Sequence, residues 1–253
     1  MKRIALLTDF GTRDPYVAAM KGVIAARTEV SVVDLTHEIA PFDVFGAAWF
    51  LRTIAHDWPH GTIFVCVVDP GVGSERKIVA MERSGQILLA PDNGLLSFVE
   101  TGKIVAVENR TLFLPGNSTT FHGRDRFAPV AAALANGLAI DQLGPPLASI
   151  VRLPYDPPSY GPMVVGTVVA VDRFGNLITD IEASRVPFQP FALEGRGVTI
   201  DRLERTYAGV APGAFLIIGS SGCIEISVAN GSAAERLQMR RLDRVRVCPI
   251  DRR

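Results

Sequence analysis

The sequence predicts a protein of the α/β class with two domains, and two observations lead to this prediction. In the first half, strand-like and helix-like patterns alternate over short connections, as they do in sheets with crossover helices. In the second half, short strand-like pieces are separated by Gly, Pro and Asn, and the helical signal is weak. We therefore predict an N-terminal α/β sandwich-like domain with a mainly parallel sheet (residues 1–153) and a smaller C-terminal β-barrel domain (residues 163–253).

The N-terminal half carries the pattern of a parallel sheet. Its predicted strands are residues 4–8, 30–35, 62–68, 78–81 and 86–89. Its predicted helices are residues 14–27, 43–55 and 125–136. We expect Asp14 to cap the first helix, with Pro15 at the first helical position. The run 62–68 is almost wholly apolar, which is typical of a parallel strand covered on both faces.

A proline-rich segment at residues 154–162 separates the two patterns. Because prolines so closely spaced cannot continue a helix or a central strand, we interpret this segment as an interdomain linker. Beyond it, the helical signal is confined to residues 233–236. The predicted strands there are residues 163–171, 177–181, 197–200, 215–219, 224–228 and 244–248.

Composition argues against several classes of function. Lys and Arg together number 26, as do Asp and Glu, so the formal net charge of +0 gives no support for a nucleic-acid or membrane partner. The three cysteines are scattered and form no CxxC pair, which argues against a disulfide framework or a zinc site. The N-terminus lacks a signal-peptide pattern and no apolar stretch reaches transmembrane length, so we expect a cytoplasmic protein. We expect neither a cofactor nor a bound metal.

Familiar catalytic signatures are present only in part. Residues 71–76 begin like a dinucleotide-binding fingerprint, but they end in arginine and lie between two predicted strands. His37 begins a zinc-protease pattern, but Pro41 stands where the second histidine belongs. Residues 219–222 lack the spacing of a serine nucleophile elbow. Nicotinamide and zinc chemistry, and a generic oxidoreductase or methyltransferase, are therefore disfavoured.

Acidic residues follow two of the predicted strands. Asp9 comes directly after the first strand and Asp69 after the third. In open α/β sheets, ligands bind beyond the carboxyl ends of the strands, so both are candidate ligand residues. Taken alone, each is equally a common turn residue. Arg76 alone is compatible with a solvated surface charge, and His122 alone with a partly exposed loop histidine.

A series of short motifs nevertheless occurs in a definite order along the chain. They are TDFG (8–11), VDPGVG (68–73), APDNGL (90–95), TFHGRD (120–125), DRFGN (172–176), TY (206–207) and GSSGCIEI (219–226). The series closely resembles the S-adenosyl-L-methionine (SAM) hydroxide adenosyltransferase family. These SAM hydrolases are relatives of the fluorinating and chlorinating enzymes that also attack SAM. The resemblance covers nearly the whole chain and both predicted domains.

The resemblance implies a reaction and an assembly. The reaction is the attack of water on the ribose 5′-carbon of SAM, which releases adenosine and L-methionine. Asp69, Arg76 and His122 are implied to hold and activate that water. Their chemistry fits, because a carboxylate can accept a proton, a guanidinium can orient it, and an imidazole can accept or donate near neutral pH. The implied assembly is a homotrimer whose active sites lie between the N-terminal domain of one subunit and the C-terminal domain of its neighbour.

The resemblance also implies which residues bind SAM. Asp9 is expected to accept both ribose hydroxyls, and Asn176 to bind the adenine edge. Phe174 and Tyr207 are expected to offer flat faces to adenine, although ordinary core packing is an equal alternative for Phe174. Asp172 is expected to pair with the methionine ammonium. The other expected substrate-binding residues are Phe42 against the ribose, Gly123, and Ser220 and Ser221 at the methionine carboxylate.

Two rival functions are compatible with much of the same pattern. A SAM-dependent 5′-halogenase must hold a desolvated halide, which a carboxylate repels. Asp69 stands where the fluorinating relatives carry tyrosine, and so favours water over halide. Phe42 and Ser221 also depart from the halogenating branch, which carries tryptophan and arginine there. The other rival, a non-catalytic adenosine- or SAM-binding module, would need the adenosine-binding residues but not the set that holds water.

Overall fold

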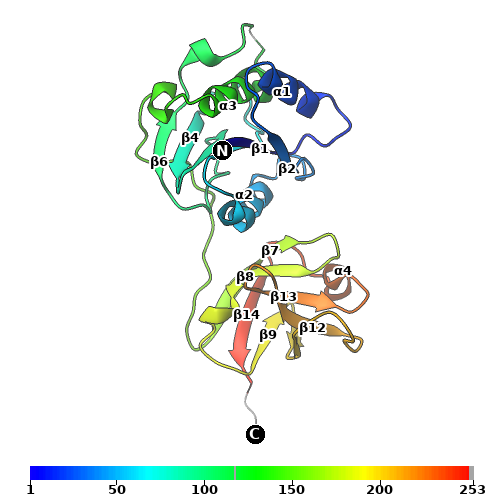
Figure 1. Ribbon diagram of the computed structural model, residues 1–253. Coiled ribbons are helices and arrows are strands. Elements are labelled where there is room, and N and C mark those ends of the chain that lie inside the picture. Colours follow the sequence, from blue (N-terminus) through cyan, green and yellow to red (C-terminus); the bar gives the residue numbers. More distant parts are fainter. Residues whose placement is uncertain (117, 251–253) are drawn as a thin grey trace. The chain divides into compact units, whose positions relative to one another are not determined.

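The computed structural model describes residues 1–116 and 118–250. The chain divides into two compact units, Met1–Pro154 and Tyr155–Arg253 (Figure 1). The predicted linker spans this division, and residues 251–253 of the predicted C-terminal domain lie outside the described residues. Tyr160, inside the proline-rich segment, packs against the core of the second unit, and its hydroxyl accepts a hydrogen bond of 3.0 Å from the Glu182 amide.

Within residues 1–116 and 118–154, the N-terminal unit contains a six-stranded sheet in the order β2-β1-β3-β5-β4-β6. Its strands are β1 (Arg3–Thr8), β2 (Val32–Thr36), β3 (Thr62–Val67), β4 (Ile78–Arg83), β5 (Gln86–Pro91) and β6 (Lys103–Ala106). Strand β1 pairs in parallel with β2 and β3, and β3 with β5, whereas β4 is antiparallel to β5 and β6. The predicted, mainly parallel sheet is confirmed. Strand β6 is not predicted, because its 4 residues are too few to show a periodicity.

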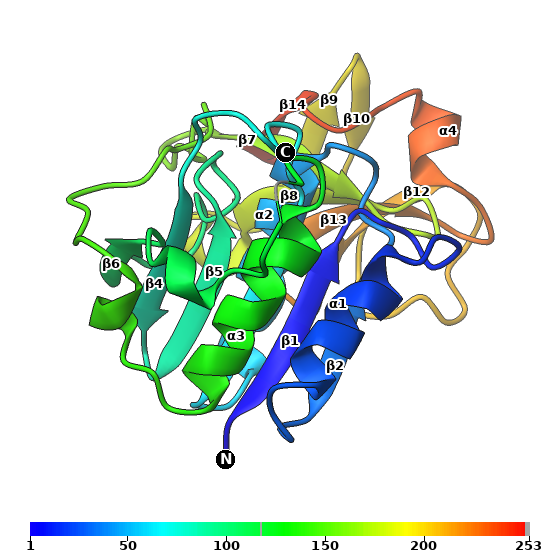
Figure 2. The ribbon, with the colours of Figure 1, turned by 90° about the horizontal axis from the view of Figure 1, so that it is seen from above.

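Helices cover both faces of this sheet. They are α1 (Tyr16–Ala25), α2 (Val44–Ile54) and α3 (Ala128–Ala135). Helices α1 and α3 lie on one face and α2 on the other (Figures 1 and 2). Along β1, Ile4 and Leu6 pack into the core that contains α1 and α3, while Ala5 and Leu7 pack into the core that contains α2. Because both faces are covered, β1 and β3 need apolar residues at successive positions, as their sequences show.

The helix starts agree with the prediction at α2 but not at α1. Asp43 caps α2, since its carboxylate accepts a hydrogen bond of 2.9 Å from the Gly46 amide. The expected cap by Asp14 is wrong. Helix α1 begins at Tyr16, and Pro15 holds the N-cap position without a side-chain hydrogen bond. The residues before Pro15 form turns, so the chain reaches helical geometry too late for Asp14 to reach the free amides.

Within residues 155–250, the C-terminal unit contains an eight-stranded sheet in the order β10-β9-β14-β7-β8-β13-β12-β11, curled into a half-barrel. Its strands are β7 (Val164–Val171), β8 (Leu177–Glu182), β9 (Phe191–Gly195), β10 (Val198–Ile200), β11 (Leu203–Glu204), β12 (Ala214–Ile218), β13 (Cys223–Val228) and β14 (Arg244–Pro249). Helix α4 spans Ala233–Leu237. The predicted β-rich C-terminal domain is confirmed, with β9 and β11 as additional strands.

No helix in the described part of the chain combines the length and apolar character needed to cross a bilayer.

Truncation of Phe64 tests the packing of the N-terminal core. Phe64 lies in β3, is wholly buried, and has its ring centroid 6.0 Å from that of Trp58. We expect Phe64→Ala to lower the free energy of unfolding by about 3–5 kcal/mol, because it removes apolar contacts and leaves a cavity. Urea denaturation followed by circular dichroism measures the change. The exposed Val151 provides the control, since Val151→Ala should change the same quantity by less than about 0.5 kcal/mol. Equal effects of the two substitutions would contradict this packing.

Candidate active site

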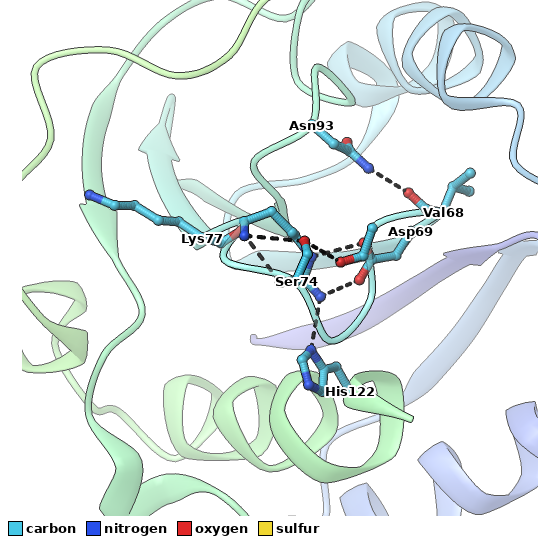
Figure 3. Close-up of polar contacts among 8 residues, drawn as sticks. Val68, Asp69, Ser74, Lys77, Asn93 and His122 are labelled. Atoms are coloured by element: carbon cyan, nitrogen blue, oxygen red, sulfur yellow. Dashed lines mark hydrogen bonds and ion pairs between the residues drawn. The ribbon is translucent and has the colours of Figure 1, made fainter. Parts of the chain in front are cut away.

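Two segments that are distant in the chain, the loop from β3 to β4 and the segment before α3, meet at the carboxyl edge of the N-terminal sheet. Asp69 follows the end of β3, and Arg76 lies near the end of the loop that leads to β4. His122 directly precedes a π-helical turn, Gly123–Phe127, that runs into α3. This turn takes the place of the first residues of the helix predicted at 125–136. Figure 3 shows Asp69 and His122 joined through a series of polar contacts.

The guanidinium of Arg76 connects the other two side chains. Its Nε donates a hydrogen bond of 2.8 Å to Asp69 Oδ1, and its Nη2 donates to Asp69 Oδ2. The same Nη2 lies 2.9 Å from His122 Nδ1. The side chains of Arg76 and Asp69 are 9% and 5% exposed, and His122 is 2% exposed. The structure thus brings together the three residues expected to hold the water, and it largely removes them from solvent.

The contact with Arg76 determines the hydrogen positions on His122. A guanidinium only donates, so Nδ1 accepts and Nε2 carries the hydrogen of the neutral ring. The buried Nε2 has no hydrogen-bond partner among the described residues. Burial, together with the positive charges of Arg126 and Arg76, lowers the pKa of His122 to about 4, against the opposing effect of Asp69 and Asp125. His122 is therefore neutral at pH 7, and its Nε2–H is available to a ligand oxygen.

The loop between β3 and β4 is held in place from several sides. The Asn93 side chain donates a hydrogen bond of 2.9 Å to the Val68 carbonyl, next to Asp69 (Figure 3). Ser74 Oγ donates to the Gly71 carbonyl at 2.6 Å. Gly73 has a φ of 81°, and a Cβ there would lie 2.7 Å from the Thr119 carbonyl oxygen, so the close approach of the 119–122 segment requires glycine.

Asp9 and Phe42 are brought together by a hydrogen bond between two loops. Asp9 Oδ2 accepts a hydrogen bond of 2.9 Å from the Phe42 amide. Phe42 has a φ of 67°, which is uncommon for a residue other than glycine, and its side chain is 71% exposed. The Gly11 amide donates to the His37 carbonyl at 2.8 Å. Asp9 therefore holds the Phe42 loop instead of capping its own turn.

An aromatic cluster joins the Asp9 loop to the His122 loop. Phe10, which follows Asp9, lies 6.0 Å from Phe121, which precedes His122, and Tyr16 lies 5.6 and 5.2 Å from these two rings, measured between centroids. Gly123 packs beside this cluster, where a Cβ would lie 3.2 Å from the Phe121 ring and 3.3 Å from the Phe10 ring. Glycine at position 123 thus allows the two loops to pack closely.

The C-terminal unit has a cavity of about 860 Å³. Five of the expected substrate-binding residues line it: Asp172, Phe174, Asn176, Tyr207 and Ser220. Ser221 is exposed at the next position and is not among the lining residues. Phe174 is 77% exposed, so core packing does not explain it.

Asp172 organises the turn that carries two of these residues. Its Oδ1 accepts hydrogen bonds from the amides of Phe174, at 2.9 Å, and Asn176, at 2.8 Å. Its Oδ2 accepts a hydrogen bond of 2.8 Å from the Asn176 side chain. The structure therefore gives Asp172 a positioning role toward Phe174 and Asn176, and it leaves the Asn176 amide oxygen to accept from a ligand.

Sequence reasoning missed Glu225, which also lines this cavity. The Tyr207 hydroxyl donates to Glu225 Oε2 at 3.2 Å. No signal in the sequence marked it, because a glutamate between two isoleucines is the ordinary alternation of a strand with one face in solvent. In residues 1–116 and 118–250, no group of three or more His, Cys, Asp or Glu side chains is arranged to hold a metal ion.

The low pKa of His122 can be measured directly. In an NMR titration we expect the His122 ring to change protonation at a pH of about 4, well below the ~6.5 of an unperturbed imidazole. Arg126→Gln should raise this pKa, because it removes a positive charge that disfavours the imidazolium. Arg27→Gln, at an exposed position on the same unit, is the control and should leave the pKa unchanged. Titration of wild-type His122 near 6.5 would contradict the burial and charge arrangement.

Comparison with known proteins identifies the family. Residues 4–144 match the model of the SAM hydroxide adenosyltransferase N-terminal domain, and residues 166–246 match that of the C-terminal domain. A Thermus thermophilus protein named (R)-S-adenosyl-L-methionine hydrolase is 39% identical over 95% of this chain and 97% of its own length. A protein named fluorinase, from Actinoplanes, is 32% identical over 70% of this chain and 71% of its own. The crystal structure of an uncharacterized conserved protein from Thermotoga maritima superposes with a TM-score of 0.89 at 35% identity, covering 97% of this chain and 99% of that one. The chain belongs to the SAM hydroxide adenosyltransferase family.

Proposed function

We propose that this chain hydrolyses SAM at the ribose 5′-carbon and releases adenosine and L-methionine. One observation carries the proposal: the Arg76 guanidinium links a carboxylate to a neutral imidazole at the edge of the sheet where ligands bind. Membership of the family, and the name of the Thermus thermophilus relative, support the same substrate.

The difficulty of the reaction lies in the nucleophile. Water oxygen forms a bond to the 5′-carbon while the bond from that carbon to the sulfonium sulfur breaks. The electron pair goes to sulfur, so methionine leaves as a neutral thioether and needs no acid to expel it. Water is a weak nucleophile that must approach in line with the breaking bond. Side chains that hold the water in this line supply an entropic advantage.

Asp69 is the residue that we propose receives the proton. Arg76 has only donors, and Nδ1 of His122 already accepts from Arg76. Each oxygen of Asp69 accepts one hydrogen bond from Arg76 and retains a further acceptor site. General-base assistance is typically worth about 10²–10⁴-fold in rate. His122 then orients the water as a donor through Nε2–H, and Arg76 stabilises the developing hydroxide character.

We propose that the remaining residues hold SAM as the family resemblance implies. Asp9 accepts the ribose hydroxyls, and its hydrogen bond to the Phe42 amide keeps Phe42 beside the ribose. Gly123 contributes by letting the loop that carries Asp9 pack closely against the loop that carries His122. The residues assigned to the other end of the substrate are Phe174, Asn176 and Tyr207 for adenine, Asp172 for the ammonium, and Ser220 and Ser221 for the carboxylate.

We further propose that the active protein is a homotrimer, with each site shared between the N-terminal unit of one subunit and the C-terminal unit of its neighbour. The expected water-holding residues lie in the N-terminal unit, whereas the cavity with its aromatic residues lies in the C-terminal unit. The cytoplasmic location and the absence of a cofactor and of a nucleic-acid partner stay predictions from the sequence.

Mixing two impaired variants tests whether the site is shared. Asp69→Ala disables the N-terminal residues, and Asn176→Ala disables the C-terminal cavity. In a trimer assembled from equal amounts of both, about a quarter of the shared sites combine two intact units, so about a quarter of wild-type activity should return. Adenosine release measured by chromatography reports it. If each site is built within one chain, the mixed trimers will be as inactive as their parents.

Product analysis separates hydrolysis from its rivals. We expect SAM incubated in ¹⁸O-labelled water with chloride present to give adenosine with the label in its 5′-hydroxyl, as seen by mass spectrometry. The Asp69 carboxylate is the physical reason, because it repels a halide and accepts a hydrogen bond from water. Formation of 5′-chloro-5′-deoxyadenosine would make the protein a halogenase. Tight binding of SAM without turnover would make it a binding module.

Substitutions in the water-holding set should lower kcat far more than they change KM. We expect Asp69→Asn to lower kcat by at least about 10²-fold, because an amide cannot act as the base. Arg76→Gln and His122→Asn should also lower kcat, since each loses a contact that orients Asp69 or the water. Lys77→Gln is the matched control, because its exposed side chain lies next to Arg76 in sequence but only its carbonyl contacts Arg76. Full turnover by all three variants would refute the assignment.

A further inference from the structure

His37 ties together the two loops that leave strands β1 and β2. These strands are parallel neighbours, so both loops start at the same edge of the sheet. His37 directly follows β2 and is 5% exposed. Pro41 excludes the zinc-protease pattern that His37 begins, so that pattern does not account for the residue. A polar ring that is buried this far is held by specific partners, and these partners define its role.

His37 contacts both ends of the loop that carries Asp9. At the start of the loop, His37 Nδ1 lies 2.8 Å from the Thr8 hydroxyl oxygen, which also accepts a hydrogen bond of 3.2 Å from the Phe10 amide. At the other end, the His37 carbonyl accepts a hydrogen bond of 2.8 Å from the Gly11 amide. Asp9 therefore lies between two anchors that a single residue provides.

The opposite side of the His37 ring faces an ion pair. His37 Nε2 lies 3.0 Å from Asp34 Oδ1, and Lys21 of α1 donates a hydrogen bond of 2.6 Å to Asp34 Oδ2. Partial burial raises the pKa of Asp34, but the hydrogen bonds and charges of Lys21 and His37 outweigh this and hold that pKa below its usual value. A carboxylate only accepts, so in the neutral ring Nε2 carries the hydrogen and Nδ1 accepts from the Thr8 hydroxyl. The ring orientation is therefore fixed from both sides.

The role assigned to Asp9 depends on the orientation of its carboxylate. A carboxylate that accepts two neighbouring hydroxyls must be held in one orientation, and side chains on loops need surrounding contacts to hold them so. The Phe42 amide contacts Oδ2 alone, whereas His37 holds the backbone on either side of Asp9. We propose that His37 is a positioning residue that keeps Asp9 in the orientation in which it accepts the ribose hydroxyls of SAM. This inference rests on the proposed function, through the assignment of Asp9 to the ribose.

Isothermal titration calorimetry of the full chain with two nucleosides tests this role. 2′,3′-Dideoxyadenosine lacks both hydroxyls that Asp9 is proposed to bind and otherwise matches adenosine. We expect His37→Leu to weaken adenosine binding by about 10-fold or more, because Asp9 is displaced, and to change dideoxyadenosine binding by less than about 2-fold. In an Asp9→Ala background, His37→Leu should change adenosine affinity by less than about 2-fold, since no carboxylate remains to be positioned.

Two further substitutions separate positioning from a general effect on stability. His37→Gln keeps one acceptor and one donor, so it should hold adenosine affinity within about 3-fold of wild type. Thr8→Val replaces a wholly buried hydroxyl with a methyl group and should reproduce the selective loss of adenosine affinity. Thr53→Val is the matched control, because its hydroxyl donates to the Trp49 carbonyl within α2, and both nucleoside affinities should stay unchanged.

The outcomes separate the inference from the function on which it rests. If His37→Leu weakens both nucleosides equally, or leaves adenosine binding unchanged, His37 only stabilises the fold and the inference is wrong. If circular dichroism shows that His37→Leu does not fold, the same comparison in Thr8→Val decides. If Asp9→Ala leaves adenosine affinity unchanged, the assignment of Asp9 to the ribose is wrong and the inference fails with it. Hydrolysis of SAM is measured separately on the wild type, so a protein that leaves SAM intact refutes the proposed function, while the nucleoside affinities still decide the role of His37.

Discussion

The ion pair between Asp69 and Arg76, extended to His122, is the interaction on which the proposed site depends. Both partners are nearly buried, so each charge is tolerated only because the other lies within hydrogen-bond distance. Removing one partner of such a pair typically costs about 3–5 kcal/mol, because it leaves an uncompensated charge inside the protein. The guanidinium suits this position because its planar donors contact a carboxylate and an imidazole at once. A lysine offers only a point charge there.

The scaffold explains how these residues are held. Strands β1 and β3 are buried on both faces, so the loops after them start from rigid points. The aromatic cluster packs the loop after β1 against the segment before α3, and glycines at positions 73 and 123 allow the close approach. Site geometry is therefore set by packing that also stabilises the N-terminal unit, which is how precise polar arrangements are usually supported.

The two units contribute different chemistry to the proposed reaction. The N-terminal unit supplies the ion pair between Asp69 and Arg76. It also supplies the neutral His122, which lies near the positive charges of Arg76 and Arg126. The C-terminal cavity supplies exposed aromatic faces and two carboxylates, and so suits a ligand that combines a flat base with a positive charge. Although the chain has no net charge, charged side chains are thus gathered at both places.

The sequence alone determined the two-part architecture, most strands, and the identity of the residues that converge, because hydrophobic periodicity and motif order are local properties of the chain. It did not predict β6 or β9, which are short pieces that gain their partners only across the sheet. It also misplaced the start of α1, where turns before Pro15 prevent Asp14 from capping. Only the tertiary structure decided which nitrogen of His122 carries the hydrogen, that Asp172 is occupied by its own turn, and that Glu225 lines a cavity with the Tyr207 hydroxyl as its hydrogen-bond donor. The first and third of these depend on contacts between residues distant in sequence, which exist only after the chain has folded, whereas the Asp172 hydrogen bonds depend on the backbone geometry of its turn, which the residue pattern does not give.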